Sequence, residues 1–378
     1  MRLIDKVISA LEASICEPYK SRVVVGFDGF IDMILKVIAS DGTRDTGKKY
    51  ITDMKEFGDH IGTRAGHSCG FVLETQELRM GGNAPILSVA LDRLGVQVTC
   101  VGTLGYPDID KIFEGAFSSA ASLYSVGSPS VSNVLEFSDG KVMMSQLEHL
   151  GNLTWGKMTD IIPGDTLIRV FSEADIVGLM NWSETRHAFD IWRGLIDDVL
   201  PKMSKRRMNR LVCFDLADCT RKPDSEIILC MEYLKEFGKY FRVLLSVNEN
   251  ELNRINKVYF NENLPLEGKI RQLYEKLDIY MLSVHSHARG MAMDSVGFYE
   301  TPRYYVEKPE ILVGAGDNFN AGLLRGMSLG CPTAESLIMA CGASSYYVRF
   351  GKSPAVEDLI GYLKNWPIED LAANRFCG

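Results

Sequence analysis

The segment VGAGDNFNAG is the pattern in this sequence that most directly suggests chemistry. It places three small residues, Gly314, Ala315 and Gly316, directly before the carboxylate of Asp317. Small residues let backbone N–H groups turn toward one point, and the helix expected next would aim its N-terminus there. This arrangement suits the charge of a transferring phosphoryl group, with Asp317 as a proton acceptor. Taken alone, the same residues fit a glycine turn with Asp317 as a helix cap equally well.

A second polar cluster, NENE, follows the apolar run FRVLLSV and contains Asn248 and Glu251. Mg²⁺ on nucleotide phosphates needs oxygen ligands, or carboxylates that hold its waters, and this pair could supply them. The same spacing is also that of a capping box at the start of a helix, which these residues alone favour.

Two further segments could bind a polyol. GFDGFID places Asp28 and Asp32 in the turn after the first expected strand, where carboxylates could accept hydrogen bonds from vicinal hydroxyls. Asp and Gly also favour turns whatever the function, so turn formation is the alternative for this segment. Gly81-Gly82-Asn83 opens an expected helix at a point where backbone could approach a substrate closely.

Alternating strands and helices must position these segments. Buried apolar strands separated by amphipathic helices predict an α/β fold with a mostly parallel sheet covered on both faces. In such sheets ligands collect at the carboxyl ends of the strands, where the four segments are expected. We predict one domain over residues 1–378, with small β segments near 39–80 and 128–148, the second being a hairpin around Asp139-Gly140. The expected strands cover 21–37, 96–105, 174–182, 210–218, 241–252 and 278–286.

Composition excludes several classes of partner. The 378 residues carry a net charge of -8 and no basic stripe, which argues against nucleic acid. The nine cysteines show no metal-ligand spacing, and Cys100, Cys213 and Cys230 sit in apolar runs, which indicates buried free thiols in a reducing compartment. No segment approaches the ~18 apolar residues that cross a bilayer, and no signal peptide is apparent. We therefore expect a cytoplasmic protein without a membrane partner.

Taken together and in this order, the motifs resemble the ribokinase-like (PfkB) carbohydrate kinase superfamily. GGNAPILSVALDRLGVQVTCVGTLG resembles its N-terminal signature, NENE its N-x-x-E magnesium motif and VGAGDNFNAG its C-terminal signature. MACGASSYYVRFGKSPAVEDL is similar to its closing helix and loop. The resemblance covers about residues 23–363. It implies a three-layer α/β/α fold with a small β lid that closes over the substrate and often forms a homodimer interface.

The resemblance also implies an activity, in which the terminal phosphoryl group of ATP is transferred to a hydroxyl of a sugar with the help of Mg²⁺. Asp317 would be the base and the backbone of 314–316 the anion hole, while Asn248 and Glu251 would position the metal. The resemblance further implies that the sugar is held by Asp32, Gly81, Gly82 and Asn83. It places Gly290, Ala340 and Ala343 along the nucleotide.

Two stretches depart from the family pattern. Ile311-Leu312-Val313 stands where Asp-Thr-Thr is usual, so the polar side chains that hold a monovalent cation in some members are missing, which argues against activation by K⁺. Pro85-Ile86-Leu87 stands where an asparagine is expected, so the sugar contacts there must differ. Four segments are similar instead to the ADP-dependent sugar kinase branch, which makes ADP an alternative donor to ATP. They are VVVGFDGFIDMI, RMGGNAPI, VHSH and VEKPEILVGAGD.

Two other functions remain open at this point. A nucleoside kinase of the same superfamily would need more aromatic side chains near Asp32, for which Phe27 and Phe30 are candidates. A catalytically silent regulator that binds a sugar or nucleotide would keep the fold without turnover. The presence of Asp317 and Glu251 argues against the regulator, and the missing Asp-Thr-Thr keeps it in consideration.

Overall fold

A nine-stranded sheet forms the centre of the protein. The computed structural model describes residues 2–18, 20–40, 47–203, 210–260 and 263–366, so residues 41–46 of the expected lid lie outside it. The strands are β1 (Arg22–Phe27), β5 (Gln97–Gly102), β6 (Ser122–Ser125), β9 (Ile176–Leu179), β10 (Leu211–Asp215), β11 (Arg242–Asn248), β12 (Met281–His285), β13 (Arg289–Asp294) and β14 (Phe298–Pro302). Their spatial order is β14-β13-β12-β11-β10-β9-β1-β5-β6, parallel from β6 to β12, with β13 and β14 antiparallel.

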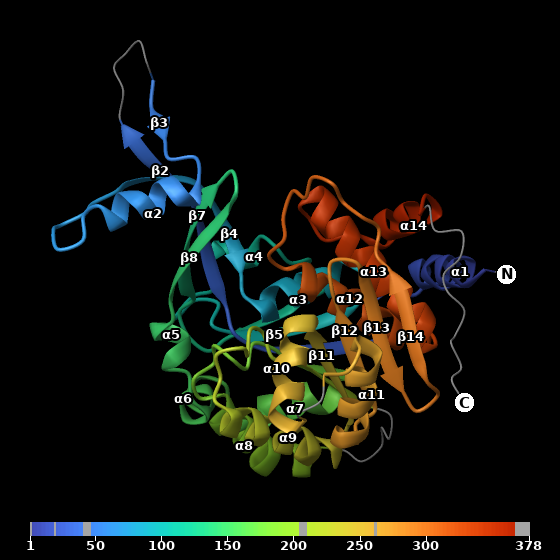
Figure 1. Cartoon of the computed structure of the whole chain (residues 1–378). Coiled ribbons are helices and arrows are strands. Elements are labelled where there is room, and N and C mark those ends of the chain that lie inside the picture. Colours follow the sequence, from blue (N-terminus) through green and yellow to red (C-terminus); the bar gives the residue numbers. More distant parts are fainter. Residues whose placement is uncertain (1, 19, 41–46, 204–209, 261–262, 367–378) are drawn as a thin grey trace.

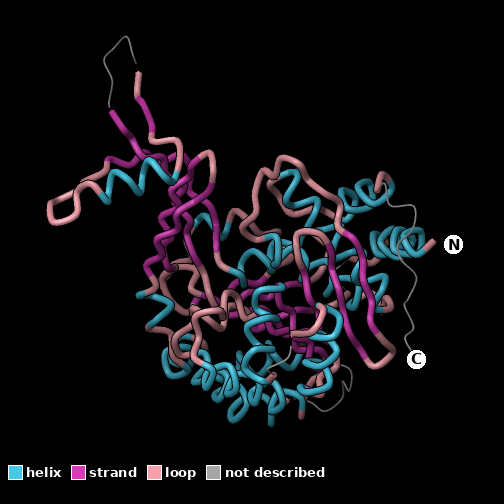
Figure 2. The backbone as a smooth tube through the Cα atoms, in the orientation of Figure 1, coloured by secondary structure: helices cyan, strands magenta, loops and turns pink. Residues whose placement is uncertain are grey.

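Helices cover both faces of this sheet (Figure 2). In β1, Val24 packs on one side and Val23 and Val25 on the other, because successive side chains of a strand point to opposite faces. The first side carries α5 (Glu148–Gly151), α6 (Trp155–Ile161), α7 (Gly164–Glu173), α8 (Ala188–Gly194), α9 (Asp224–Gly238), α10 (Glu249–Tyr259) and α11 (Leu266–Leu277). The second side carries α1 (Leu3–Ile15), α3 (Asn83–Arg93), α12 (Ala315–Ser328), α13 (Thr333–Phe350) and α14 (Val356–Lys364).

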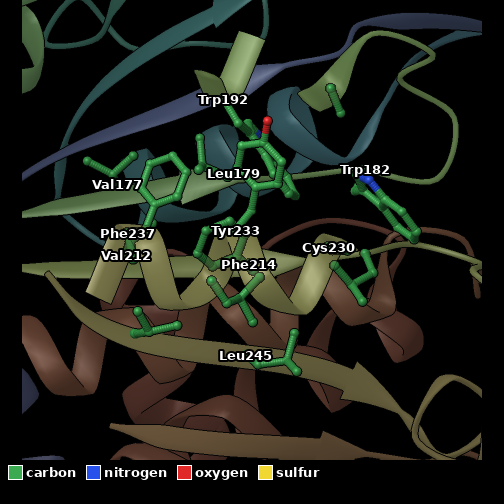
Figure 3. Packing of buried hydrophobic residues seen from close by; sticks show 14 of the residues in the cluster. Val177, Leu179, Trp182, Trp192, Val212, Phe214, Cys230, Tyr233, Phe237 and Leu245 are labelled. Carbon is green, nitrogen blue, oxygen red and sulfur yellow. The ribbon is translucent and has the colours of Figure 1, made fainter. Parts of the chain in front are cut away.

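Aromatic rings fix the helices of the first side onto the middle strands (Figure 3). The ring of Phe214 on β10 lies 5.2 Å from that of Trp192 on α8 and 5.3 Å from that of Phe237 on α9, both edge-on. All three side chains are buried, and such pairs add to the free energy of burial. The strand ends that carry polar residues therefore project from a rigid base.

A second, smaller sheet stands away from the main body (Figure 1). In it β2 pairs with β4 antiparallel and with β7 parallel, and β7 forms an antiparallel hairpin with β8. It has its own small core, which includes Leu35, Phe57 and Leu135. Its elements are β2 (Phe30–Ser40), β3 (Lys49–Tyr50), α2 (Met54–Gly62), β4 (Val72–Gly81), β7 (Ser130–Phe137) and β8 (Gly140–Gln146). The short α4 (Lys111–Glu114) packs near β4.

The predicted fold class is confirmed, with two local differences. The hairpin at Asp139-Gly140 forms as expected, with Phe137 opposite Gly140. The small sheet, however, also recruits residues 30–38, which precede the first predicted β segment. The segment expected to enter a loop after β11 instead begins α10 at once, because Asn248 caps that helix. The cysteines predicted to be buried are buried and free. None of the described helices is long and apolar enough to span a bilayer.

Candidate active site

Polar side chains collect at the carboxyl edge of the large sheet. Asp28 follows β1, Asn181 follows β9, Asp215 ends β10 and Asn248 ends β11, and these four strands run in the same direction. Helix α12 begins beside them, since Asn83 at the start of α3 hydrogen-bonds to its first turn. The sequence prediction that the motifs meet at this edge is therefore confirmed by the geometry.

The turn at residues 314–317 starts α12 and brings Asp317 to the centre of this edge. Gly314 has a φ of 89°, and a Cβ there would lie 2.8 Å from the Tyr347 hydroxyl, so only glycine fits. Asp317 is only 4% exposed, and its Oδ1 accepts a hydrogen bond of 3.1 Å from Asn83 Nδ2. The amide of Ala315 donates to the Leu312 carbonyl at 3.1 Å, which engages one of the three amides predicted to form an anion hole.

Two cavities meet at this turn. The smaller, of about 130 Å³, is lined by Gly314 and Asp317, together with residues of α3 and of the small sheet. The larger, of about 600 Å³, is lined by Ala315 and Gly316, together with Asn248. The four residues of the turn thus face two compartments, with the buried carboxylate in the smaller one.

Burial raises the pKa of Asp317 well above its usual value, and the neighbouring carboxylates of Asp215 and Asp28 raise it further. The hydrogen bond from Asn83 acts in the opposite direction. Burial likewise raises the pKa of Asp215 to about 6, although Ala217 N donates to that carboxylate at 2.9 Å. A cluster of buried acids of this kind holds protons more tightly than free carboxylates do, and a basic ligand or cation would release them.

Asp28 lies beneath α3 and does not line either cavity. It is fully buried, and it accepts hydrogen bonds from Asn83 N at 2.9 Å, Ala84 N at 2.7 Å and Asn181 Nδ2 at 2.8 Å. Gly82 lets this carboxylate approach, since a Cβ there would lie 3.2 Å from Asp28 Oδ2. The direct sugar contact predicted for Asp28 is thus not what the structure displays. Its carboxylate fixes the start of α3 and with it Asn83.

Asp32 lies on β2 rather than in the expected turn, and it lines the smaller cavity. Burial raises its pKa to about 6, and the charge of Arg79 opposes this. A Cβ on Gly81 would lie 2.7 Å from the Asp32 carboxyl carbon and from both of its oxygens. Gly81 therefore contributes by leaving room for that carboxylate.

Asn181 and Glu184 also line the smaller cavity and were missed by the sequence analysis. Asn181 has a left-handed backbone with φ 54°, and its Nδ2 donates to Asp28 Oδ2 at 2.8 Å and to Glu184 Oε2 at 3.0 Å. Its Oδ1 is buried without a hydrogen-bond partner among the described residues. Strained backbone and an unpaired acceptor beside a cavity are both typical of functional sites. Each residue is an isolated polar side chain after a strand, so no local pattern reveals it.

Asn248 and Glu251 form the capping box that was the alternative reading of this motif. Asn248 N donates to Glu251 Oε2 at 2.9 Å, Asn248 Nδ2 donates to Oε1 at 2.5 Å, and Glu251 N donates to Asn248 Oδ1 at 3.0 Å. Glu251 is 4% exposed, and burial raises its pKa well above the usual value. Among the described residues, no group of three or more His, Cys, Asp or Glu side chains is arranged to hold a metal.

Gly290, Ala340 and Ala343 do not line the larger cavity, contrary to the place expected for them along a nucleotide. A Cβ on Gly290 would lie 2.7 Å from Cys341 Sγ, and both alanines are fully buried in α13. These small residues let β13 pack closely on the helices. The cavity wall is formed instead by residues 303–307 after β14, which the sequence analysis did not identify.

Several known proteins are similar to this chain. A ketohexokinase from Haloferax volcanii is 26% identical over 347 residues, which are 91% of each chain. Among solved structures, the adenosine kinase of Sinorhizobium meliloti (15% identity, 91% of this chain and 98% of that one, TM-score 0.63) has the same fold. So does Arabidopsis thaliana ribokinase complexed with ribose and ATP (16% identity, 92% and 99%, TM-score 0.61). The model of the prokaryotic ketohexokinase family matches residues 4–366. The chain therefore belongs to the prokaryotic ketohexokinase family of ribokinase-like (PfkB) sugar kinases, and it is an ATP-dependent carbohydrate kinase.

Proposed function

We propose that the protein transfers the terminal phosphoryl group of ATP to a hydroxyl of a ketohexose bound in the smaller cavity. The observation that carries this proposal is the position of the 314–317 turn between two cavities. A nucleotide in the larger cavity and a small polyol in the smaller one would meet at this turn. The ketohexose itself is suggested by the Haloferax volcanii relative, a ketohexokinase.

In this mechanism Asp317 accepts the proton of the attacking hydroxyl. Its carboxylate lines the smaller cavity, and Asn83 orients it through the 3.1 Å hydrogen bond to Oδ1. Because Ala315 N is engaged by Leu312, the amides of Gly314 and Gly316 are the ones that we assign to the charge of the transferring group. A positioned base contributes about 10² to 10⁴ in rate, and preorganised amides contribute most of the remainder.

Three polar side chains that line the smaller cavity fit the hydroxyls of a sugar: Asp32, Glu184 and Asn181 with its unpaired Oδ1. A nucleoside is disfavoured, because Phe27 packs in the core and Phe30 is the single aromatic residue that lines this cavity in the described part of the chain. A cavity of about 130 Å³ is also small beside the ~300–1,000 Å³ of typical drug-sized pockets.

We further propose that Asn248 and Glu251 hold Mg²⁺ that arrives with the nucleotide. The side-chain oxygens of each residue already accept hydrogen bonds from nitrogens of the other, and Glu251 is almost fully buried, so they fit contact through the waters of the ion better than direct ligation. Mg²⁺ usually keeps several waters and binds through one or two carboxylates and the phosphates of the substrate. When bound, the ion supplies positive charge that stabilises the phosphate oxygens.

The small sheet would act as a lid. Asp32 on β2, Ser132 on β7 and Met143 on β8 all line the smaller cavity, so closure of the sheet would exclude water from the sugar site.

The surface of the small sheet also carries exposed apolar side chains, which favours a homodimer through this sheet. Their exposed fractions are 61% for Val72, 41% for Leu73, 54% for Leu78, 48% for Met143 and 46% for Met144. A change of Leu78 to glutamate should leave a monomer in light-scattering measurements if this assignment holds.

A substrate panel tests the proposed function. Purified protein is incubated with Mg²⁺ and with ATP or ADP, together with ketohexoses, aldohexoses, ribose and adenosine, and phosphorus NMR identifies the product. We expect a ketohexose phosphate with ATP as donor. Phosphorylation of adenosine in preference to every sugar would show that the smaller cavity accepts a nucleoside. Thermal stabilisation by ligands without any product would indicate a silent binder.

A further inference from the structure

Arg303 follows β14 directly and lines the larger cavity. It is the single lysine or arginine among the described residues that line this cavity. Its Nη1 donates to the Ser286 carbonyl at 2.7 Å, and its Nη2 donates to Ser344 Oγ. Its own amide donates to the Ala288 carbonyl at 2.8 Å, so backbone and guanidinium are both fixed.

Among the described residues, no carboxylate forms an ion pair with this guanidinium, although Glu249 and Glu307 also line the larger cavity. The guanidinium donates instead to two neutral oxygens, the Ser286 carbonyl and Ser344 Oγ. The titratable groups that influence it are Cys341 and Tyr362, and burial raises the pKa of both, so they are neutral at pH 7. Burial, with the charge of Arg303, lowers the pKa of His285 to about 3, so this ring is neutral as well. Arg303 is partly buried, and a cation withdrawn from water is costly unless an anion compensates it.

Ser344 connects this cation to the catalytic turn. Its hydroxyl accepts the hydrogen bond from Arg303 and donates to the Ala315 carbonyl at 2.6 Å. Ala315 is the first residue of α12 and lines the same cavity. The next residue, Ser345, also lines the cavity, and its buried hydroxyl has no partner among the described residues. This part of the wall therefore presents a fixed guanidinium and a hydroxyl without a hydrogen-bond partner to the cavity.

We propose that Arg303 binds the phosphate chain of the nucleotide and, through Ser344, fixes the turn that begins at Ala315. The inference rests on the proposed use of the larger cavity for ATP. Arginine suits this task because its planar fork can donate two parallel hydrogen bonds to a phosphate, which lysine does not reproduce. Binding of the nucleotide would then hold the anion-hole turn at the same time.

Isothermal titration of ATP, ADP and adenosine tests the first half of the proposal. Replacing Arg303 with glutamine should weaken the binding of ATP and ADP by about 10- to 100-fold, which is the effect of losing a charge-assisted hydrogen bond. The affinity for adenosine should stay within about 2-fold of its normal value. The matched control is R289Q, which removes an exposed guanidinium paired with Glu300 at 3.0 Å and should change nothing. R303K keeps the positive charge and replaces R303Q in the test if R303Q does not fold. It too should weaken the binding of ATP without changing the binding of adenosine.

S344A tests the second half. It removes the connection to Ala315 without removing the cation, so kcat should fall by about 10-fold while the Kd for ATP changes little. A merely structural role would lower the thermal midpoint without this separation of kcat from Kd. Wild-type ATP affinity in both R303Q and R303K, or an unchanged kcat in S344A, would overturn the inference and leave the proposed function standing. If the unaltered protein bound neither ATP nor adenosine, the proposed function itself would fail.

Discussion

Replacing Gly81 with alanine should damage sugar recognition selectively. The new Cβ would lie 2.7 Å from the Asp32 carboxyl carbon and from both oxygens, whereas ordinary contact begins at 3.4 Å, so this carboxylate must retreat by about 0.7 Å. A charge-assisted hydrogen bond contributes about 1.5–3 kcal/mol, so its loss predicts a rise in the KM for sugar of about 10- to 150-fold. The KM for ATP should stay nearly constant, because Gly81 and Asp32 do not line the larger cavity.

Steady-state kinetics with each substrate varied in turn, together with thermal melting, measures this effect. G58A on α2 is the matched control, because a Cβ at Gly58 meets nothing within 4 Å. It should leave both KM values unchanged and, in a helix, should stabilise the fold slightly. An unchanged sugar KM in a folded G81A protein, or an effect confined to ATP, would refute the assignment of Asp32 to the sugar.

Three further predictions concern the same site. The pKa of Asp317 is raised, and the base must be ionised to act, so kcat/KM should rise with pH through that pKa. The acidic limb of the profile should therefore lie above the pKa of ~3.9 of free aspartate. A pH profile that is flat down to pH 4 would contradict this. N181A should raise the sugar KM about 10-fold because it removes an acceptor, whereas S183A, which also deletes a buried polar atom but lies outside the lining of both cavities described above, should not. E251Q should weaken the apparent affinity for Mg²⁺ about 10- to 100-fold in titrations of activity, and unchanged Mg²⁺ dependence would exclude Glu251 from the metal site.

The sequence identifies the parts of the site that are continuous in the chain. The turn at 314–317 needs small residues for its backbone and a carboxylate at the start of a helix. Both requirements concern neighbouring residues, so the sequence alone predicts this turn. The alternation of apolar strands and amphipathic helices predicts the layered fold for the same reason. The spacing of Asn248 and Glu251 also fits the capping box that starts α10, which the sequence analysis gave as the alternative to a metal pair.

Other residues depend on how distant segments pack. Asp28 and Asp32 stand in one short segment, yet the first is covered by α3 and the second faces a cavity because β2 leaves the main sheet. No feature of the sequence indicates which of these two carboxylates is covered and which faces a cavity. Arg303 and Asn181 each follow a strand as single polar residues, and their importance comes only from the cavities beside them. Gly290 was assigned to a ligand although it serves packing, because glycine permits both.

Single-turnover kinetics of D317N tests the central assignment most directly. Asparagine keeps the size of the side chain and an oxygen that can accept the hydrogen bond from Asn83, but it cannot take up a proton. With ATP and the sugar bound as tightly as in the unaltered protein, the rate of phosphoryl transfer should fall at least about 10²-fold. A D317N protein that transfers the phosphoryl group within a few-fold of the normal rate would contradict the role of Asp317 as the base.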